Sequence, residues 1–242
     1  MPEDHRWLTL HLEAPLIAFG GVRIDHIGIT RDFPALSMMT GLLANALGYR
    51  RTDWKKHQEL QERLVFAARR DRENPAGLLT DTQNARLEKN DRGWTTWGEF
   101  EKRGGGDGTY KAPHRRLRDY HTDAHVVVVL RLRGGPAPDL DTLAEALAKP
   151  ARPLFIGRKP CLPAGPLLRE EPFVHAATAH DALRKIAGAK ARAFWPLGEG
   201  PETGSKVDRI VDLPDIRNWR TGLHGGARKV VEGRVVPEGL AA

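Results

Sequence analysis

The stretch Phe33–Gly48, FPALSMMTGLLANALG, combines a helix-start signal with an apolar stripe at helical spacing. Pro34 disfavours a preceding helix, Ser37 is the expected N-cap, and Gly48 ends the segment. The pattern predicts a helix of about three turns that packs into the core. Its first turn, with Ser37 and Thr40, carries no acid, so its N–H groups would be free to bind a phosphate. An ordinary capped core helix is the alternative that this stretch leaves open.

Three apolar segments around this helix have the pattern of strands. Trp7–Glu13 alternates apolar and polar residues, as a strand with one buried face does, and Ala14-Pro15 is expected to end it. Arg63–Arg70 is the expected second strand. Asp123–Leu132, DAHVVVVLRL, has a β-branched run bounded by polar residues and is the expected central strand.

The remaining elements predict an α+β chain. A short helix is expected at Leu143–Ala148 with Asp141 as its cap, and a last strand at Leu154–Gly157. The resulting order is strand, helix, strand, long insertion, strand, helix, strand. That order is the split βαβ or ferredoxin-like plan, which RNA-binding RRM domains share. We therefore expect an RRM-like domain over residues 1–169 and a small β-rich C-terminal subdomain over 170–242, with a helix at Ala179–Ala187 and extended pieces at Arg209–Leu213 and Arg228–Val236.

Residues 74–118 interrupt this order with many charges and almost no periodic apolar face. An insertion of this length without a core of its own is usually functional or disordered. Trp94 and Trp97 argue against plain disorder, because an exposed indole has to be buried against something. Both tryptophans are therefore candidate contacts with a partner.

Composition restricts the partner and the compartment. Lysine and arginine number 38 against 31 acids, and the formal charge of +7 favours a polyanionic partner. Cys161 is the only cysteine, which excludes an internal disulfide and a cysteine-rich zinc site. The first residues lack the apolar core of a signal peptide, and no run of 18 apolar residues occurs, so we expect a cytoplasmic protein without a membrane association.

Common catalytic and cofactor motifs are not found. The glycine run Gly104–Gly108 is not followed by Lys-Ser or Lys-Thr and does not follow an expected strand, which excludes a P-loop and argues against a dinucleotide fingerprint. His114, His121 and His125 have no carboxylate pair or cysteine placed with them, so we expect no metal site. No cofactor is expected.

The segment His114–His121, HRRLRDYH, is the first candidate nucleic-acid contact. Its arginines can bind phosphates bidentately and Tyr120 can stack on a base, although a solvated charged face would look the same. Alternatively, Tyr120 and His121 would serve as acid and base in metal-free RNA cleavage by a 2′-hydroxyl. Arg158-Lys159, after the last expected strand, is a second candidate phosphate contact, with simple solubility as the alternative.

Four of these stretches together resemble the CasD family of type I-E CRISPR Cascade subunits. Ala14–Gly20 is similar to that family's first turn, and Ile156–Cys161 is similar to its basic turn. Pro34, Ser37 and Gly41–Gly48 resemble its helix start. Order and spacing agree over most of residues 7–168. The entry to the central strand is matched by Arg118, Tyr120, Asp123 and Ala124. Two positions depart from the family: Leu36 stands where the family has a basic residue, and Phe19 stands where it has a tryptophan. Arg31 is expected to supply the missing positive charge near Leu36.

The resemblance implies a non-catalytic subunit that caps the Cascade backbone filament and holds the 5′ handle of the CRISPR RNA, with target DNA reached indirectly through the complex. It also implies that residues 74–118 form a β-hairpin thumb toward the backbone subunit, that the large subunit is a further partner, and that Trp94 and Trp97 lie at a contact. A metal-independent endoribonuclease using Tyr120 and His121, and a free-standing RNA chaperone or ribosome-associated RRM protein, remain open. The residues expected at the RNA are Arg23, His26, Arg31, Ser37, Thr40, Arg115, Arg116, Arg118, Tyr120, Arg158 and Lys159.

Overall fold

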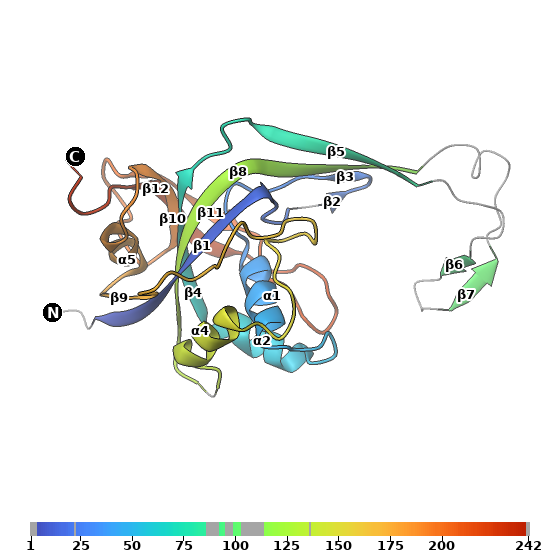
Figure 1. Ribbon diagram of the computed structural model, residues 1–242, viewed down its shortest axis with the longest axis horizontal. Helices are drawn as coiled ribbons and strands as arrows, with labels where there is room; N and C mark the ends of the chain where they lie inside the picture. Colours follow the sequence, from blue (N-terminus) through green and yellow to red (C-terminus); the bar gives the residue numbers. More distant parts are fainter. Residues whose placement is uncertain are drawn as a thin grey trace.

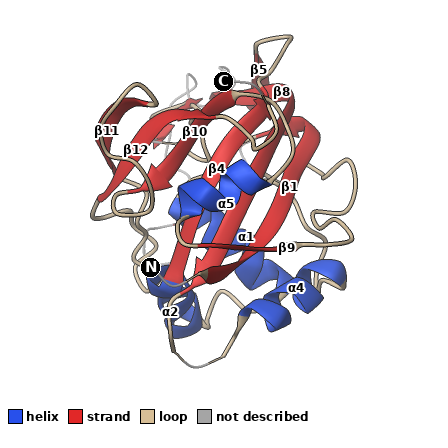
Figure 2. Cartoon of the chain, turned by 90° about the vertical axis from the view of Figure 1, so that its left-hand side faces the viewer, coloured by secondary structure: helices blue, strands red, loops and turns tan. Residues whose placement is uncertain are grey.

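A large, mostly antiparallel sheet runs through the computed structural model, and helices cover both of its faces (Figures 1 and 2). The structure describes residues 4–21, 23–85, 92–94, 99–102, 114–135 and 137–240. The main path of the sheet has the order β11-β12-β10-β4-β8-β1-β9. In that order the strands are Val207–Leu213, Arg228–Val235, Ala191–Pro196, Leu64–Arg72, His114–Leu132, His5–Ile17 and Phe173–Ala176.

Strand β8 is 19 residues long and belongs to two parts of the molecule. Its second half pairs antiparallel with β1 and β4, with Val128 opposite both Leu10 and Ala68. Its first half pairs antiparallel with β5 (Leu78–Ala85) and parallel with β3 (Ile27–Gly28). Strands β5 and β8 thereby form a two-stranded arm that extends well beyond the sheet body (Figure 1). The shorter strands are β2 (Arg23–Ile24), which pairs with β3, and the separate pair β6 (Arg92–Trp94) and β7 (Phe100–Lys102).

Alternation along β8 gives the sheet two buried faces. Val126, Val128 and Leu130 pack against helices α1 (Leu36–Ala46) and α4 (Leu140–Ala148). Val127 and Val129 lie in the other apolar cluster, which includes residues of α5 (Ala179–Lys185). Figure 2 shows α5 on one side of the sheet and α1 on the other. The expected central strand is confirmed, and the continuous run of valine results from burial on both faces.

Several expected elements are present with other boundaries. The second strand is confirmed as β4, and α1 buries Met39, Leu42 and Leu43 as its stripe predicts. Strand β1 does not stop at Ala14-Pro15 but continues to Ile17. Proline is tolerated there because Thr9 and His11 donate on the side of β1 away from β8, and the missing N–H of Pro15 falls on that same side.

Two predictions of secondary structure are wrong. Leu154–Gly157 is not a strand but a loop with Ile156 buried, and β9 supplies the strand beside β1 instead. The connector after Gly48 contains the unexpected helix α2 (Trp54–Arg63), in which only His57, Leu60 and Gln61 are buried. A helix that packs through so few apolar side chains has no clear periodic signal in its sequence.

The C-terminal residues extend the same sheet. The expected helix and strands are found as α5, β11 and β12, while β9 and β10 were not anticipated. Strand β10 pairs with β4, with Ala193 opposite Arg69, so residues 170–240 continue the first sheet instead of forming a separate layer. None of the described helices is long and apolar enough to cross a membrane.

Candidate nucleic-acid interface

The turn Ile156–Cys161 is fastened against the end of β1. Ile156 N donates to Cys161 O at 2.7 Å, and Cys161 N donates to Arg158 O at 2.9 Å. Gly157 has a φ of +90° and lies so close to the backbone that a Cβ atom would be 1.6 Å from Ala18 O. Only glycine fits this position, and the turn therefore holds Arg158 in a defined place.

The Arg158 guanidinium reaches from this turn to the base of the arm. Its Nη1 donates to Asp119 O on β8, and its Nη2 donates to Gly28 O on β3, both at 2.9 Å. The guanidinium also lies 4.9 Å from the centre of the Tyr120 ring. Tyr120 is 2% exposed, so it is a packing surface for Arg158, and the prediction that it stacks on an RNA base is wrong.

Arg118 meets Arg158 at the backbone of Gly28. A Cβ atom on Gly28 would lie 2.9 Å from Arg118 Nη1 and 3.3 Å from Arg158 Nη2. Arg118 Nη1 also donates to Leu117 O at 2.9 Å. Both arginines are partly exposed, and Lys159 in the same turn is exposed. We call Arg118, Arg158 and Lys159 the arm-base cluster; Arg118 is 40 residues before Arg158 in the sequence, yet both guanidinium groups lie at Gly28.

Two N–H groups in the first turn of α1 already have a partner. Leu36 N donates to Asp215 Oδ2 at 2.8 Å, and Ser37 N donates to Asp215 O at 3.2 Å. The N-cap is Ala35 and not Ser37. Asp215 is 1% exposed and paired with Arg228 at 2.9 Å, so a buried carboxylate already stands where a phosphate was expected. The predicted phosphate site at this helix start is wrong.

Thr40 is also misassigned as an RNA contact. It has no exposed surface, and its Oγ1 donates to Leu36 O at 2.8 Å inside the helix. A hydroxyl enclosed in this way cannot meet an RNA backbone. Ser37 is half-buried.

The cap of α4 also differs from the prediction. Asp139, and not Asp141, caps this helix by accepting a hydrogen bond from Thr142 N at 2.8 Å.

The cations before α1 are placed differently from one another. Arg31 is half-buried and its Nη2 donates to Pro214 O at 3.0 Å. His26 Nδ1 lies 3.1 Å from Asp25 Oδ2, and its carbonyl accepts from Leu117 N. Arg23 belongs to β2, but its side chain lies outside the described residues.

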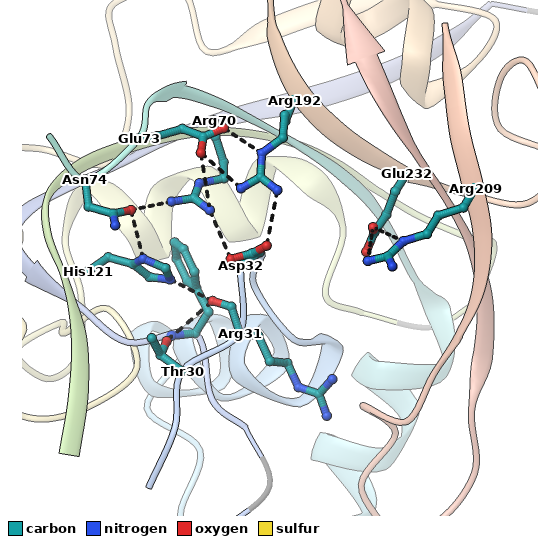
Figure 3. A network of polar contacts seen from close by, with 11 residues as sticks. Thr30, Arg31, Asp32, Arg70, Glu73, Asn74, His121, Arg192, Arg209 and Glu232 are labelled. Atoms are coloured by element: carbon teal, nitrogen blue, oxygen red, sulfur yellow. Dashed lines mark hydrogen bonds and ion pairs between the residues drawn. The ribbon is translucent and has the colours of Figure 1, made fainter. Parts of the chain in front are cut away.

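A network of ion pairs holds the segment before α1 to the sheet (Figure 3). Asp32 pairs with Arg70 of β4 at 3.3 Å and with Arg192 of β10 at 3.2 Å. Arg192 also pairs with Glu73 at 2.7 Å, and this hydrogen bond holds the pKa of Glu73 below its usual value. Sequence reasoning missed the network, because its members are far apart in the chain and carry no spacing signal.

His121 closes this network on the arm side (Figure 3). Its Nε2 is 2.8 Å from Arg31 O and its Nδ1 is 3.0 Å from Asn74 Oδ1. The imidazole is 2% exposed, and burial lowers its pKa. Since Tyr120 is buried to the same degree, the two side chains proposed as acid and base of RNA cleavage both lie inside the protein.

The remaining candidates are Arg115, Arg116, Trp94 and Trp97. Arg115 is exposed and Arg116 is half-buried on β8, opposite Asn84 and Gln83 of β5. The side chain of Trp94 and all of Trp97 lie outside the described residues. Within the described part of the chain, no group of three or more His, Cys, Asp or Glu residues could hold a metal ion.

Comparison with known proteins first gives the class and then the family. Residues 7–231 match the family model described as CRISPR-associated protein (Cas_Cas5). The chain is therefore a CRISPR-associated protein, and it belongs to the Cas5/CasD family. A relative is the CRISPR system Cascade subunit CasD of Escherichia coli (strain K12), 29% identical over 160 residues, which are 64% of this chain and 66% of that protein.

Two solved structures share the fold. A chain of a CRISPR RNA-guided surveillance complex has a TM-score of 0.63 at 21% sequence identity, over 98% of this chain and 93% of that one. A crystal structure of a Cas protein has a TM-score of 0.58 at 25% identity, over 96% of this chain and 98% of that one. The mixed α/β architecture with its large antiparallel sheet is thus the architecture of known Cas proteins.

Proposed function

We propose that this chain is a non-catalytic subunit of a type I-E CRISPR Cascade complex that binds the 5′ handle of the CRISPR RNA and caps the backbone filament. Membership of the Cas5/CasD family and similarity to a Cascade subunit support the assembly. The arm-base cluster supports the RNA contact. Target DNA is reached only through the complex.

The fold within this proposal is RRM-like, with the β5–β8 arm as its thumb. Four strands in the order β4-β8-β1-β9, with α1 and α4 on one face, are consistent with the ferredoxin-like plan. In an RRM the opposite face of the sheet stacks RNA bases on aromatic residues. Here Trp7 and Trp195 on that face have no exposed surface, because α5 packs on it. The RNA therefore has to lie elsewhere, and the arm base is the cationic place that remains next to the thumb.

The meeting of two guanidinium groups at Gly28 is the observation that carries this proposal. An anion bound beside Gly28 would be within reach of both guanidinium groups, those of Arg118 and Arg158. Carbonyl groups fix the direction of Arg158, which leaves its position unchanged when a phosphate arrives. Lys159 adds an exposed charge, and Arg115 and Arg116 continue the positive charge along the arm.

The neighbouring backbone subunit would meet the arm. Exposed apolar side chains gather on the strands that build its base, where Leu78 and Leu79 are 55% and 45% exposed and Ile27 is 40% exposed. Apolar surface of this kind is suited to burial by a protein partner. Trp94 and Trp97, within residues 74–118, remain predicted contacts with a partner.

The proposal is tested by purifying the assembled complex with Lys159→Glu and with Arg118→Gln. We expect less bound CRISPR RNA and a log–log salt slope of RNA binding lowered by about 0.7 for each lost phosphate contact. Lys149→Glu, an exposed lysine after α4, is the matched control and should change neither. Arg158→Lys retains the positive charge but loses the planar guanidinium that can bind a phosphate through two N–H groups, so its RNA binding is expected to be intermediate. Unchanged RNA content and slope in Lys159→Glu and Arg118→Gln would overturn the assignment.

Two further experiments test the endoribonuclease and the free-standing RNA-binding protein. Repeat RNA incubated with the isolated protein in EDTA should stay intact, whereas a single cut that His121→Ala abolishes would show an endoribonuclease. Sequencing of the RNA that copurifies with the tagged chain should give CRISPR RNA. Mixed cellular RNA would instead indicate a free-standing RNA-binding protein.

A further inference from the structure

A second concentration of cations and aromatic rings lies on α2 and on the loop of residues 216–224. In Figures 1 and 2 α2 lies at the bottom of the molecule, whereas β5 of the arm lies at the top. We call residues 49–63 and 216–224 together the α2 surface; the proposed RNA contact at the arm base does not use it. It has seven cations, Arg50, Arg51, Lys55, Lys56, Arg63, Arg217 and Arg220, against three acids, Asp53, Glu59 and Glu62.

Two glutamines of α2 hold the loop in place. Gln61 Nε2 donates to Arg217 O at 2.9 Å, and Gln61 Oε1 accepts from Trp219 Nε1 at 3.1 Å. Gln58 Oε1 accepts from Trp219 N at 3.3 Å. Gln61 is 2% exposed and uses both ends of its amide, so the loop has a defined position beside the helix. The α2 surface is therefore a constructed surface and not a free tail of charges.

Cations lie next to the tryptophan rings of this surface. Lys55 Nζ is 5.7 Å and the Arg220 guanidinium carbon is 5.8 Å from the centre of the Trp54 ring. The Arg217 guanidinium carbon is 5.0 Å from the centre of the Trp219 ring. Both tryptophans are partly exposed, but the Trp219 ring also stacks on the His57 ring with 4.7 Å between the ring centres, so Trp54 is the platform left for a base. Within the described part of the chain, Arg217 Nε has no hydrogen-bond partner.

A hollow of about 400 Å³ adjoins the other flank of α2. Tyr49 and Leu60 contribute to its lining, together with the cations Lys56 and Arg63 and the acid Glu59. The 100° step of a helix places Lys55 between this flank and the flank of Trp54. A flexible chain that crosses α2 at Lys55 would thus meet cations on both sides, an aromatic platform on one and a hollow on the other.

We propose that the α2 surface binds single-stranded nucleic acid, with phosphates at Lys55, Lys56 and Arg220 and a base against Trp54. The excess of cations suits a polyanion, and a partly exposed indole ring beside cations is a stacking platform that single strands use without sequence preference. A duplex hides the faces of its bases, so it would engage only the cations. The proposal does not depend on the RNA contact at the arm base.

The test uses the full chain in a Lys159→Glu background, so that a labelled strand reports on the α2 surface. The probes are a fluorescein-labelled single-stranded oligonucleotide of mixed sequence and the duplex of the same sequence. Lys55→Glu with Arg220→Glu should weaken single-strand binding about tenfold or more and lower the log–log salt slope by about 1.4, at about 0.7 for each phosphate contact. Lys149→Glu is the charge-matched control and should leave both unchanged.

A second variant separates stacking from charge. Trp54→Leu should weaken single-strand binding at least about fivefold, as expected for one lost stacked base, with the salt slope and the duplex affinity unchanged. Thermal unfolding of each variant shows whether the fold is intact; the two charge reversals are at exposed positions and keep the test decisive if Trp54→Leu is unstable. The proposal is overturned if the double variant binds the single strand like its parent. It is equally overturned if that variant keeps the strand but loses a protein chain from the assembled complex, since the surface would then dock a protein.

Discussion

Asp215 caps the helix that begins at Leu36, although the two residues are 179 positions apart in the chain. The Asp215 carboxylate accepts from Leu36 N at 2.8 Å and pairs with Arg228, whose guanidinium carbon lies 4.8 Å from the centre of the Phe66 ring. A negative charge at a helix start is favourable for the helix dipole. The same contact removes the helix start from the set of places where RNA can bind.

Replacing Asp215 should destabilise the protein. Asp215→Ala removes the cap and leaves a largely buried Arg228 without its partner, and we expect a loss of about 3–5 kcal/mol in the free energy of unfolding. Urea denaturation measures it. Asp212→Ala, which breaks an exposed pair with Lys229, is the control and should cost no more than about 1 kcal/mol. A small effect of Asp215→Ala would mean that the contact contributes little to the fold.

Thr40 and RNA binding should be independent. Thr40→Val keeps the shape of a side chain that has no exposed surface, and it loses one hydrogen bond to Leu36 O, at a stability cost of about 1 kcal/mol. CRISPR RNA affinity should not change, whereas Lys159→Glu should reduce it. Filter binding of both variants at two salt concentrations provides the comparison. Weaker RNA binding by Thr40→Val at unchanged stability would restore the helix start as a contact.

Gly157 should be intolerant of a side chain. A Cβ atom there would lie 1.6 Å from Ala18 O at a φ of +90°, so Gly157→Ala has to move the turn that carries Arg158 and Lys159. We expect a clear loss of RNA affinity and a lower melting temperature. Gly165→Ala, a few residues farther along the chain, would meet no atom within 4 Å and is the matched control. Equal RNA affinity of the two variants would contradict the role of this turn.

Arg69 should hold α5 on the sheet. It has no exposed surface, its Nη1 donates to Leu183 O at 2.7 Å and to Ile186 O at 2.9 Å, and it pairs with Asp71. Arg69→Met removes the hydrogen bonds to these carbonyls and leaves the Asp71 carboxylate without its ion-pair partner, and should cost about 3–5 kcal/mol in unfolding free energy. Arg209→Ala, which breaks a pair with Glu232 at an exposed arginine, is the comparison and should cost under about 1 kcal/mol. Similar unfolding midpoints of the two variants would contradict the role of Arg69 in holding α5 on the sheet.

Stability should fall in mild acid because of the pair His11 and His125. His11 Nδ1 is 3.0 Å from His125 Nε2, and burial together with the neighbouring His125 lowers the pKa of His11 to about 4. Burial also lowers the pKa of His125. The unfolded chain then takes up protons at about pH 6.5, before the folded chain does. The stabilising contribution is therefore complete above pH 6.5 and is lost as the pH falls from 6.5 toward 4.

Urea unfolding at pH 7.5 and at pH 5 measures this loss, which we expect to be roughly 1–2 kcal/mol. The double variant His11→Gln with His125→Gln should lose less over the same interval. Some dependence should remain, because burial also lowers the pKa of His121 and of His180. Identical pH dependence in parent and variant would exclude the pair as its source.

Local patterns in the sequence were sufficient to predict the helix and the strands that bury a regular set of apolar side chains. The alternation of Trp7–Glu13, the valine run of Asp123–Leu132 and the stripe of Phe33–Gly48 each predicted an element that the structure contains. The four matched stretches also pointed to the family that the comparison shows. Burial of one face of an element produces an apolar period in the sequence, and burial of both faces of a strand produces a continuous apolar run; either pattern can be recognised without a structure.

Long-range contacts decided the rest. Helix α2 buries few residues and has no strong period, β9 replaces the strand expected at Leu154–Gly157, and Asp215 takes the place of both a local cap and a bound phosphate. The sequence by itself determined the elements and the basic residues; only the tertiary structure showed that Arg118 and Arg158 meet at Gly28 while Tyr120 and Thr40 are enclosed. The physical reason is that hydrophobic periodicity is a local property of the chain, whereas the partner of a charge or of a helix end is chosen by the packing of distant segments.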